Sequence, residues 1–81
     1  MDGRLMPMTC RIGRGLSVVA EDEHGIELEG LTRLSPGRSI VLFGVTPAPA
    51  RGRRAYVARW RVMRLGRGGL IYRGYCEWLA D

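Results

Sequence analysis

The chain has 81 residues, enough for one small domain and too few for a two-domain enzyme with a cofactor fold of its own. Its hydrophobic content of 46% and charged content of 26% are typical of globular proteins and exclude intrinsic disorder. Thirteen basic residues against eight acidic ones give a net charge of +5, and every basic residue is arginine. A positive charge of this size permits an anionic partner without demonstrating one.

The sequence predicts one cytoplasmic domain. No apolar run approaches the roughly 18 residues of a membrane span, and residues 1–8 hold no apolar core of the signal-peptide kind. The two cysteines, Cys10 and Cys76, are far apart, which indicates reduced thiols in place of a disulfide scaffold or a zinc site. We expect residues 1–9 to form a flexible lead and residues 10–81 a single domain.

The first half of the domain predicts a β-hairpin. Twelve glycines and four prolines interrupt the chain too often for long helices. Residues 16–20 are rich in β-branched side chains, and residues 26–29 alternate apolar and acidic side chains, as strands do. The polar residues 21–25 between them end in glycine, which is typical of a tight turn. Together these segments predict a hairpin over residues 16–29.

Turn signals divide the second half into three further strands. A Pro-Gly turn at residues 36–37 precedes residues 39–45, an apolar run that predicts a strand covered on both faces. Residues 46–54 contain two prolines and a glycine, and predict a long loop. A glycine-rich turn then joins strands over residues 55–65 and 70–78. Five to six strands without a helix predict an all-β fold, a small antiparallel β-barrel.

In the strand over residues 55–65, strict alternation predicts two faces. One face holds Tyr56, Ala58, Trp60 and Val62, and the other holds Val57, Arg59, Arg61 and Met63. Because Trp60 then points away from Arg59 and Arg61, these three residues cannot form one platform for stacking nucleic-acid bases.

No set of residues predicts catalysis. A chain without lysine has neither a Walker A motif nor a Schiff-base lysine. His24 is the only histidine, and its neighbours Asp22 and Glu23 are too close in sequence to converge with it on one metal ion. We therefore expect a protein that is not an enzyme and that holds no metal and no cofactor.

The order of these elements resembles the PilZ domain family, the bacterial receptor modules for cyclic di-GMP. The shared features are a hairpin with a glycine after its turn, a Pro-Gly turn before an apolar strand, an Ala/Val-x-Trp strand, and a last strand that ends in an aromatic residue. They fall at residues 18–28, 34–37, 41–43, 55–60 and 72–78. The resemblance covers residues 16–79 and implies a PilZ-like barrel with a role in cyclic di-GMP signalling.

The two elements with which that family holds its nucleotide are altered here. The family uses an R-x-x-x-R loop and a [D/N]-x-S-x-x-G turn. Alignment on Gly25 puts Ala20 at the acidic position of the turn and Asp22 at its serine position. The arginines nearest to the first element, Arg11 and Arg14, have a different spacing. The resemblance thus leaves Arg11, Arg14 and Gly25 as the candidate nucleotide-binding residues.

Three functions follow. The first is a signalling adaptor that binds another protein and has weak or lost cyclic di-GMP binding. Its candidate contact residues are the large aromatic ones, Trp60, Trp78, Tyr72 and Tyr75. The first alternative is a true cyclic di-GMP receptor in which Arg4, Arg11 and Arg14 form a non-standard clamp. The second, which the orientation of Trp60 disfavours, is a barrel that binds single-stranded nucleic acid. An exposed edge strand would also permit a homodimer.

Overall fold

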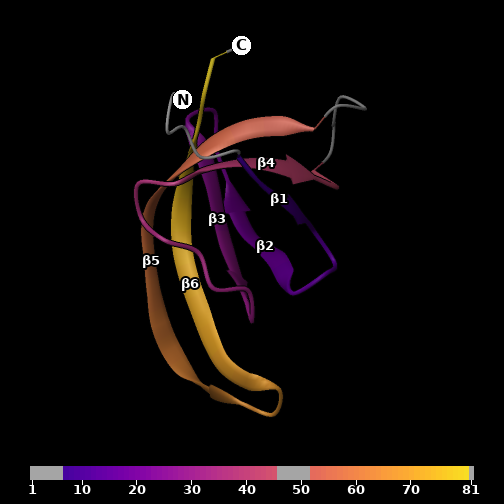
Figure 1. Ribbon diagram of the computed structural model, residues 1–81, viewed down its shortest axis with the longest axis vertical. Helices are drawn as coiled ribbons and strands as arrows, with labels where there is room; N and C mark the ends of the chain where they lie inside the picture. The colour runs from indigo at the N-terminus through magenta and orange to yellow at the C-terminus, as the bar shows by residue number, and fades with distance from the viewer. Residues whose placement is uncertain (1–6, 46–51, 81) are drawn as a thin grey trace, which may run out of the picture.

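The computed structural model describes residues 7–45 and 52–80 and, within them, six β-strands and no helix. The strands are β1 (Met8–Arg11), β2 (Leu16–Glu21), β3 (Gly25–Gly30), β4 (Ser39–Phe43), β5 (Arg53–Gly66) and β6 (Gly69–Trp78). They form one sheet in the order β1-β4-β5-β6-β3-β2, which curls into a half-barrel with β5 and β6 as its longest strands (Figure 1). No helix long and apolar enough to cross a membrane occurs in these residues.

A short link between the two edge strands forces the sheet to curl. β1 and β2 lie at opposite ends of the strand order, yet only residues 12–15 join them. A flat sheet of this order would hold its edges about 24 Å apart, whereas the chain from Arg11 to Leu16 reaches at most about 18 Å. The Gly13 N–H donates to the Leu16 carbonyl at 2.8 Å and fixes the link. β1 and β2 accordingly lie close together in Figure 1.

The expected all-β barrel is confirmed, but one of its strand pairs is not antiparallel. β1 and β4 are parallel, with Met8 opposite Ile40. The other pairs in the described residues are antiparallel. The reason is the length of chain between β1 and β4, which contains the whole β2–β3 hairpin and therefore allows the crossover that a parallel pair needs.

The concave inner face of the sheet holds the hydrophobic core. Buried side chains come from all six strands and from the segments that flank β4. They are Cys10, Leu16, Ile26, Leu28, Leu34, Ile40, Leu42, Val45, Ala55, Val57, Trp60 and Cys76. The removal of these side chains from water is the main stabilising contribution in a chain of this size.

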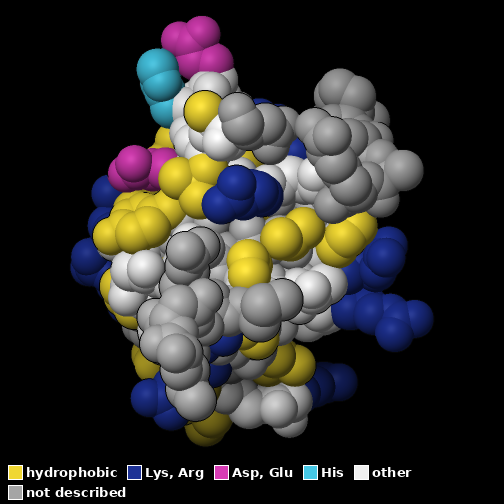
Figure 2. Space-filling view, turned by 45° about the horizontal axis from the view of Figure 1, so that its top comes forward, with side chains coloured by type: hydrophobic (Ala, Val, Ile, Leu, Met, Phe, Trp, Pro, Cys, Tyr) yellow, Lys and Arg dark blue, Asp and Glu magenta, His cyan; other side chains and the backbone are white. Residues whose placement is uncertain are grey.

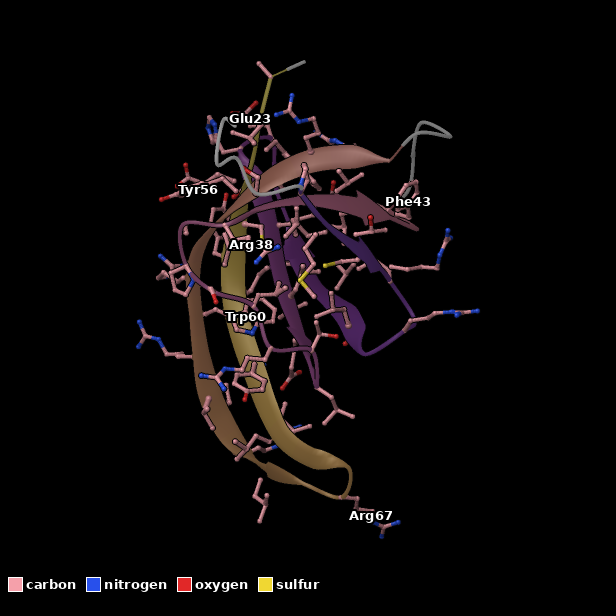
Figure 3. All side chains as sticks on the ribbon, in the orientation of Figure 1. Glu23, Arg38, Phe43, Tyr56, Trp60 and Arg67 are labelled. Atoms are coloured by element: carbon pink, nitrogen blue, oxygen red, sulfur yellow. The ribbon has the colours of Figure 1, made fainter. Side chains whose placement is uncertain are left out.

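A β-bulge at Ala58 changes the faces of β5. The register of β5 against β6 shifts between Val57 and Arg59, so Ala58 is an extra residue on β5. Val57 and Trp60 therefore both reach the core, and Tyr56 is exposed on the outside, as Figure 3 shows. The prediction that Tyr56 and Trp60 share a face is wrong, because strict alternation makes no allowance for the inserted residue.

Both predicted hairpins are present. The hairpin over residues 16–29 is formed by β2 and β3, and the C-terminal hairpin is formed by β5 and β6. The apolar strand is β4, which ends at Phe43 and not at residue 45. Local alternation and turn chemistry therefore predict these elements to within a few residues.

The ends of two other predicted segments differ from the structure. β1 includes Met8 and Thr9, which the sequence assigns to the lead, while residues 1–6 of that lead, with Arg4, lie outside the described residues. The predicted loop over residues 46–54 gives way to β5 at residue 53. The rest of that loop up to residue 51 also lies outside the described residues.

Gly74 provides a test of the packing between β5 and β6. It lies opposite Trp60, and a Cβ atom there would collide with the Arg59 carbonyl oxygen and lie 2.5 Å from Cε3 of the indole. We expect Gly74→Ala to lower the free energy of unfolding by about 3 kcal/mol or more, as measured by urea denaturation.

Gly66→Ala is the matched control, because its Cβ would meet the movable end of Ile71 at 2.8 Å. It should change the free energy of unfolding by less than about 1 kcal/mol. Equal losses from the two substitutions would contradict this account of the packing.

Candidate functional site

The three candidate nucleotide-binding residues lie at two ends of the β2–β3 hairpin. Arg11 ends β1, with its guanidinium 5.2 Å from the centroid of the Phe43 ring. Arg14 is exposed in the link, where its backbone N–H donates to the Arg11 carbonyl at 3.1 Å. Gly25 begins β3 at the far end of the hairpin, about 16 Å away along the strand. The structure thus joins the backbones of Arg11 and Arg14 in one turn and leaves Gly25 apart, and their binding of a nucleotide stays a prediction.

The Asp22 carboxylate is committed to the turn between β2 and β3. Its Oδ1 accepts hydrogen bonds from the backbone N–H groups of His24 and Gly25, both at 2.8 Å, and from the Tyr75 hydroxyl at 3.0 Å. The bond from His24, followed by that from Gly25, holds the pKa of Asp22 below its usual value of 3.8, because both favour the charged form. Gly25 itself is needed for space, since a Cβ there would collide with the Cys76 carbonyl oxygen.

The outer face carries two adjoining shallow hollows that share Glu27 and Arg59. The larger, of about 320 Å³, is lined by Ala20, Glu21, Asp22, Glu27, Arg59 and Tyr75. The smaller, of about 170 Å³, is lined by Glu27, Arg59, Arg61, Met63, Arg73 and Gly74. Three carboxylates and one guanidinium border the larger hollow, and the Arg59 guanidinium lies 5.5 Å from the centroid of the Tyr75 ring. This arrangement disfavours a phosphate beside the turn.

Glu29 forms an ion-pair cluster on the same outer face. Its carboxylate lies 2.8 Å from Nη1 of Arg64 on β5 and 3.7 Å from Nη2 of Arg73 on β6. The hydrogen bond from Arg64, aided by the charges of both arginines, holds the pKa of Glu29 below its usual value of 4.5. The cluster therefore ties β3 to the two longest strands.

The aromatic residues expected to contact a partner belong mainly to the core. Trp60 is only 9% exposed, and its indole N–H donates to the Thr32 carbonyl at 3.1 Å. Tyr72 and Trp78 are partly buried and pack against the core cluster. Tyr75 is half-buried on the outer face. Trp60 is thus a core residue and not a surface anchor, and it lies on the opposite face from its two arginine neighbours, as predicted.

The end of the β5–β6 hairpin, residues 62–71, extends beyond the neighbouring strands and is here named the arm. β3 pairs with β6 only as far as Tyr72, and β4 pairs with β5 only as far as Tyr56. The arm continues past the ends of the other strands in Figure 1, and Figure 3 shows Arg67 at its tip. None of its ten residues is buried.

Large hydrophobic side chains gather on the arm and beside it. Those exposed on the arm are Val62, Met63, Leu65 and Leu70. Leu65 is 77% exposed, and Leu31 of the β3–β4 loop, also exposed, lies next to the turn at Gly68. The alternation of side chains in the sequence does not indicate that these residues are exposed. The available signal is length, because the predicted strands over residues 55–65 and 70–78 are longer than any other predicted strand.

The two cysteines are buried, whereas the histidine is exposed. Cys10 and Cys76 are free and buried, and burial raises the pKa of both thiols, to about 12 for Cys76. A thiol that stays protonated at neutral pH is a poor nucleophile. His24 and Glu23 project into solvent, with Nε2 of His24 3.3 Å from Oε1 of Glu23, and the histidine is the cyan side chain at the top of Figure 2. Within the described part of the chain, no three His, Cys, Asp or Glu residues are grouped to hold a metal.

Comparison of the chain with protein-family models, with curated proteins and with solved structures finds no match. The resemblance to the PilZ family therefore rests on the order of the sequence features, and it stays a prediction.

The turn carboxylate gives a prediction about pH. Because the folded-state pKa of Asp22 lies below 3.8, its charge stabilises the fold above that pH, and this contribution is lost as the pH falls through the folded pKa. In Asp22→Asn the amide oxygen still accepts hydrogen bonds but does not titrate. We expect the Tm advantage of the wild-type chain to shrink between about pH 5 and about pH 2.5, followed by circular dichroism.

Tyr75→Phe is the control for this experiment. It removes the hydroxyl bond to Asp22 but keeps both backbone bonds, so its melting curves should retain most of the acid sensitivity of the wild type. A difference between wild type and Asp22→Asn that is constant with pH would count against the assigned role of the charge.

Proposed function

We propose that the protein is a small binding module that docks another protein on its arm. The resemblance to the PilZ family adds the context of bacterial second-messenger signalling, as an adaptor in which direct cyclic di-GMP binding is weak or lost. The observation that carries the proposal is that the arm holds four exposed large hydrophobic side chains and no buried residue.

The arm does not contribute to the hydrophobic core of the barrel. All the buried hydrophobic residues of the described core lie outside residues 61–75. Burial of apolar surface stabilises a protein by about 25 cal/mol per Å², and the exposed side chains of the arm lack this stabilisation. A two-stranded ribbon without neighbours is marginally stable at best. A cluster of exposed apolar side chains on such a ribbon is typical of a surface that is covered by a partner.

The outer face supports weak or lost nucleotide binding. Arg11 and Arg14 lie at one end of the β2–β3 hairpin, while Gly25 and Asp22 lie at the other. The hollow beside the turn is bordered mainly by carboxylates, which repel a cyclic dinucleotide with two phosphates. The Asp22 carboxylate is also occupied by three hydrogen bonds within the protein.

Nucleic-acid binding has less support, although the chain is basic. Single-strand binding uses aromatic rings that are free to stack on bases. Trp60 is buried. The ring of Tyr75 lies near the Arg59 guanidinium on the outer face, which also carries Glu27 and Glu29. Neither of these two rings therefore offers the arginines an open platform.

Leu65→Asp tests docking on the arm. Because Leu65 is 77% exposed, the substitution should change stability by less than about 0.5 kcal/mol, whereas a carboxylate in an apolar interface should weaken binding by about tenfold or more. The measurement is affinity capture on the immobilised chain, followed by calorimetric titration of the purified captured protein with each variant.

Val19→Asp is the matched control, since Val19 is exposed on β2 and lies outside the arm. It should bind the captured protein like the wild type. If Leu65→Asp binds equally well, the arm is not the docking surface.

A calorimetric titration with cyclic di-GMP tests the nucleotide component. We expect no binding heat at about 1 mM ligand, a concentration that detects even weak complexes. Micromolar binding that Arg11→Ala/Arg14→Ala abolishes would overturn this expectation and identify the two arginines as a rebuilt phosphate clamp.

A further inference from the structure

One edge of the arm is open to an additional strand. The backbone of β5 bonds to the β3–β4 loop at Val57, whose carbonyl accepts from the Gly37 N–H at 2.7 Å and whose N–H donates to the Arg38 carbonyl at 2.9 Å. Beyond Val57, β6 is the only strand that pairs with β5 in the described residues. We name the side of β5 that faces away from β6 over residues 61–66 the arm edge; it begins at Arg61, one residue before the arm. Unpaired backbone groups along such an edge are a template for another strand.

The two faces of the arm edge differ in character. Val62 lies opposite Tyr72, which packs against the core, so Val62 is on the inner face. Arg61 lines the hollow on the outer face, and Arg64 reaches Glu29 on that same face. The register shift at Met63 keeps Arg64 on the same face as Arg61, so an added strand would meet apolar groups on one side and arginines on the other.

The positive charge at the arm edge favours an added strand with acidic side chains. No acidic residue occurs between Glu29 and Glu77 in the sequence, so the whole C-terminal hairpin up to Cys76 is cationic. Arg64 shares the Glu29 carboxylate with Arg73, whereas Arg61 has no ion pair among the described residues. The carboxylates of an added strand could therefore pair with the positive charge of Arg61.

A second copy of the chain fits the arm edge poorly. Two arm edges paired with each other would place the Arg61 and Arg64 side chains of both copies on one face, and facing like charges destabilise a sheet. This repulsion disfavours a homodimer at this edge and does not apply to an acidic strand.

We propose that the arm edge binds an extended acidic segment of the partner protein as an added β-strand. Backbone hydrogen bonds supply affinity, carboxylates of the segment face Arg61, and its alternate aliphatic side chains cover Val62 and Leu65. The six residues of the arm edge match a segment of about 20 Å. This inference rests on the proposed docking function and specifies the partner of that same surface.

The test uses a fluorescein-labelled peptide of about eight residues that alternates Glu and Val, titrated with the full chain in an anisotropy measurement. We expect a dissociation constant below about 0.1 mM, and no binding at about 1 mM for the same peptide with Lys in place of Glu. Arg61→Glu should weaken binding by about tenfold or more. Arg54→Glu, an exposed arginine of β5 in the part paired with β4, is the matched control and should change affinity by less than about twofold.

Two N-methylated versions of the acidic peptide separate strand addition from simple charge attraction. In each, alternate amides are methylated, so that one version loses the donors facing the arm edge and the other loses the opposite set. Strand addition predicts that one version binds and the other does not. Equal binding of both versions, equal binding of the Lys peptide, or no binding of the acidic peptide overturns the proposal.

Other occupants would give different results. Tighter binding of a labelled single-stranded oligonucleotide that Arg61→Glu abolishes would assign the edge to nucleic acid, and a dimer that the acidic peptide fails to dissociate would assign it to a second copy. Either result overturns the proposal. If the peptide fails while Leu65→Asp still abolishes partner binding, docking on the arm stands and strand addition is rejected. If Leu65→Asp has no effect, both are rejected.

Discussion

A four-residue link holds the two edge strands of the sheet close together, and the rest of the structure depends on this constraint. Because β1 and β2 cannot separate, the sheet must curl, and a curled sheet has an inner and an outer face of different character. Apolar side chains from six strands meet on the inner face, which gives a short chain a continuous core. The outer face keeps the charged side chains, including the turn carboxylate and the Glu29 cluster.

The two longest strands serve both the barrel and the arm. Near the barrel, the bulge at Ala58 lets Val57 and Trp60 both enter the core, and Gly74 on the neighbouring strand leaves room for the indole. In the arm, β5 and β6 extend beyond the ends of β3 and β4, and their hydrophobic side chains are exposed. The hydrogen bond between Arg64 and Glu29 links the start of the arm to β3. The exposed hydrophobic side chains of the arm are thus carried by strands whose other ends belong to the core.

Local sequence patterns predicted the strands but not how side chains meet across them. Alternation and turn residues were sufficient for the β2–β3 hairpin, and a glycine-rich turn was sufficient for the β5–β6 hairpin. The bulge at Ala58 was not predictable, because it depends on how β5 matches β6 and on the packing of Trp60. Contacts between residues that are close in the chain were predictable, as for Arg11 and Arg14. It could not foresee that Asp22 bonds to Tyr75, 53 residues away. The exposure of the arm likewise depends on where β3 and β4 end, and the sequences of β5 and β6 carry no information about those ends.

The division of the chain into a barrel that folds and an arm that binds is the central claim, and one measurement tests it directly. Val62 and Tyr72 lie opposite each other, so an Asn-Gly turn can join them and replace residues 63–71. The account predicts that this shortened chain unfolds cooperatively, with a Tm within about 5 °C of the wild type by circular dichroism, because the arm contributes no buried residue. A shortened chain without a cooperative transition would contradict the account and make the arm a part of the fold.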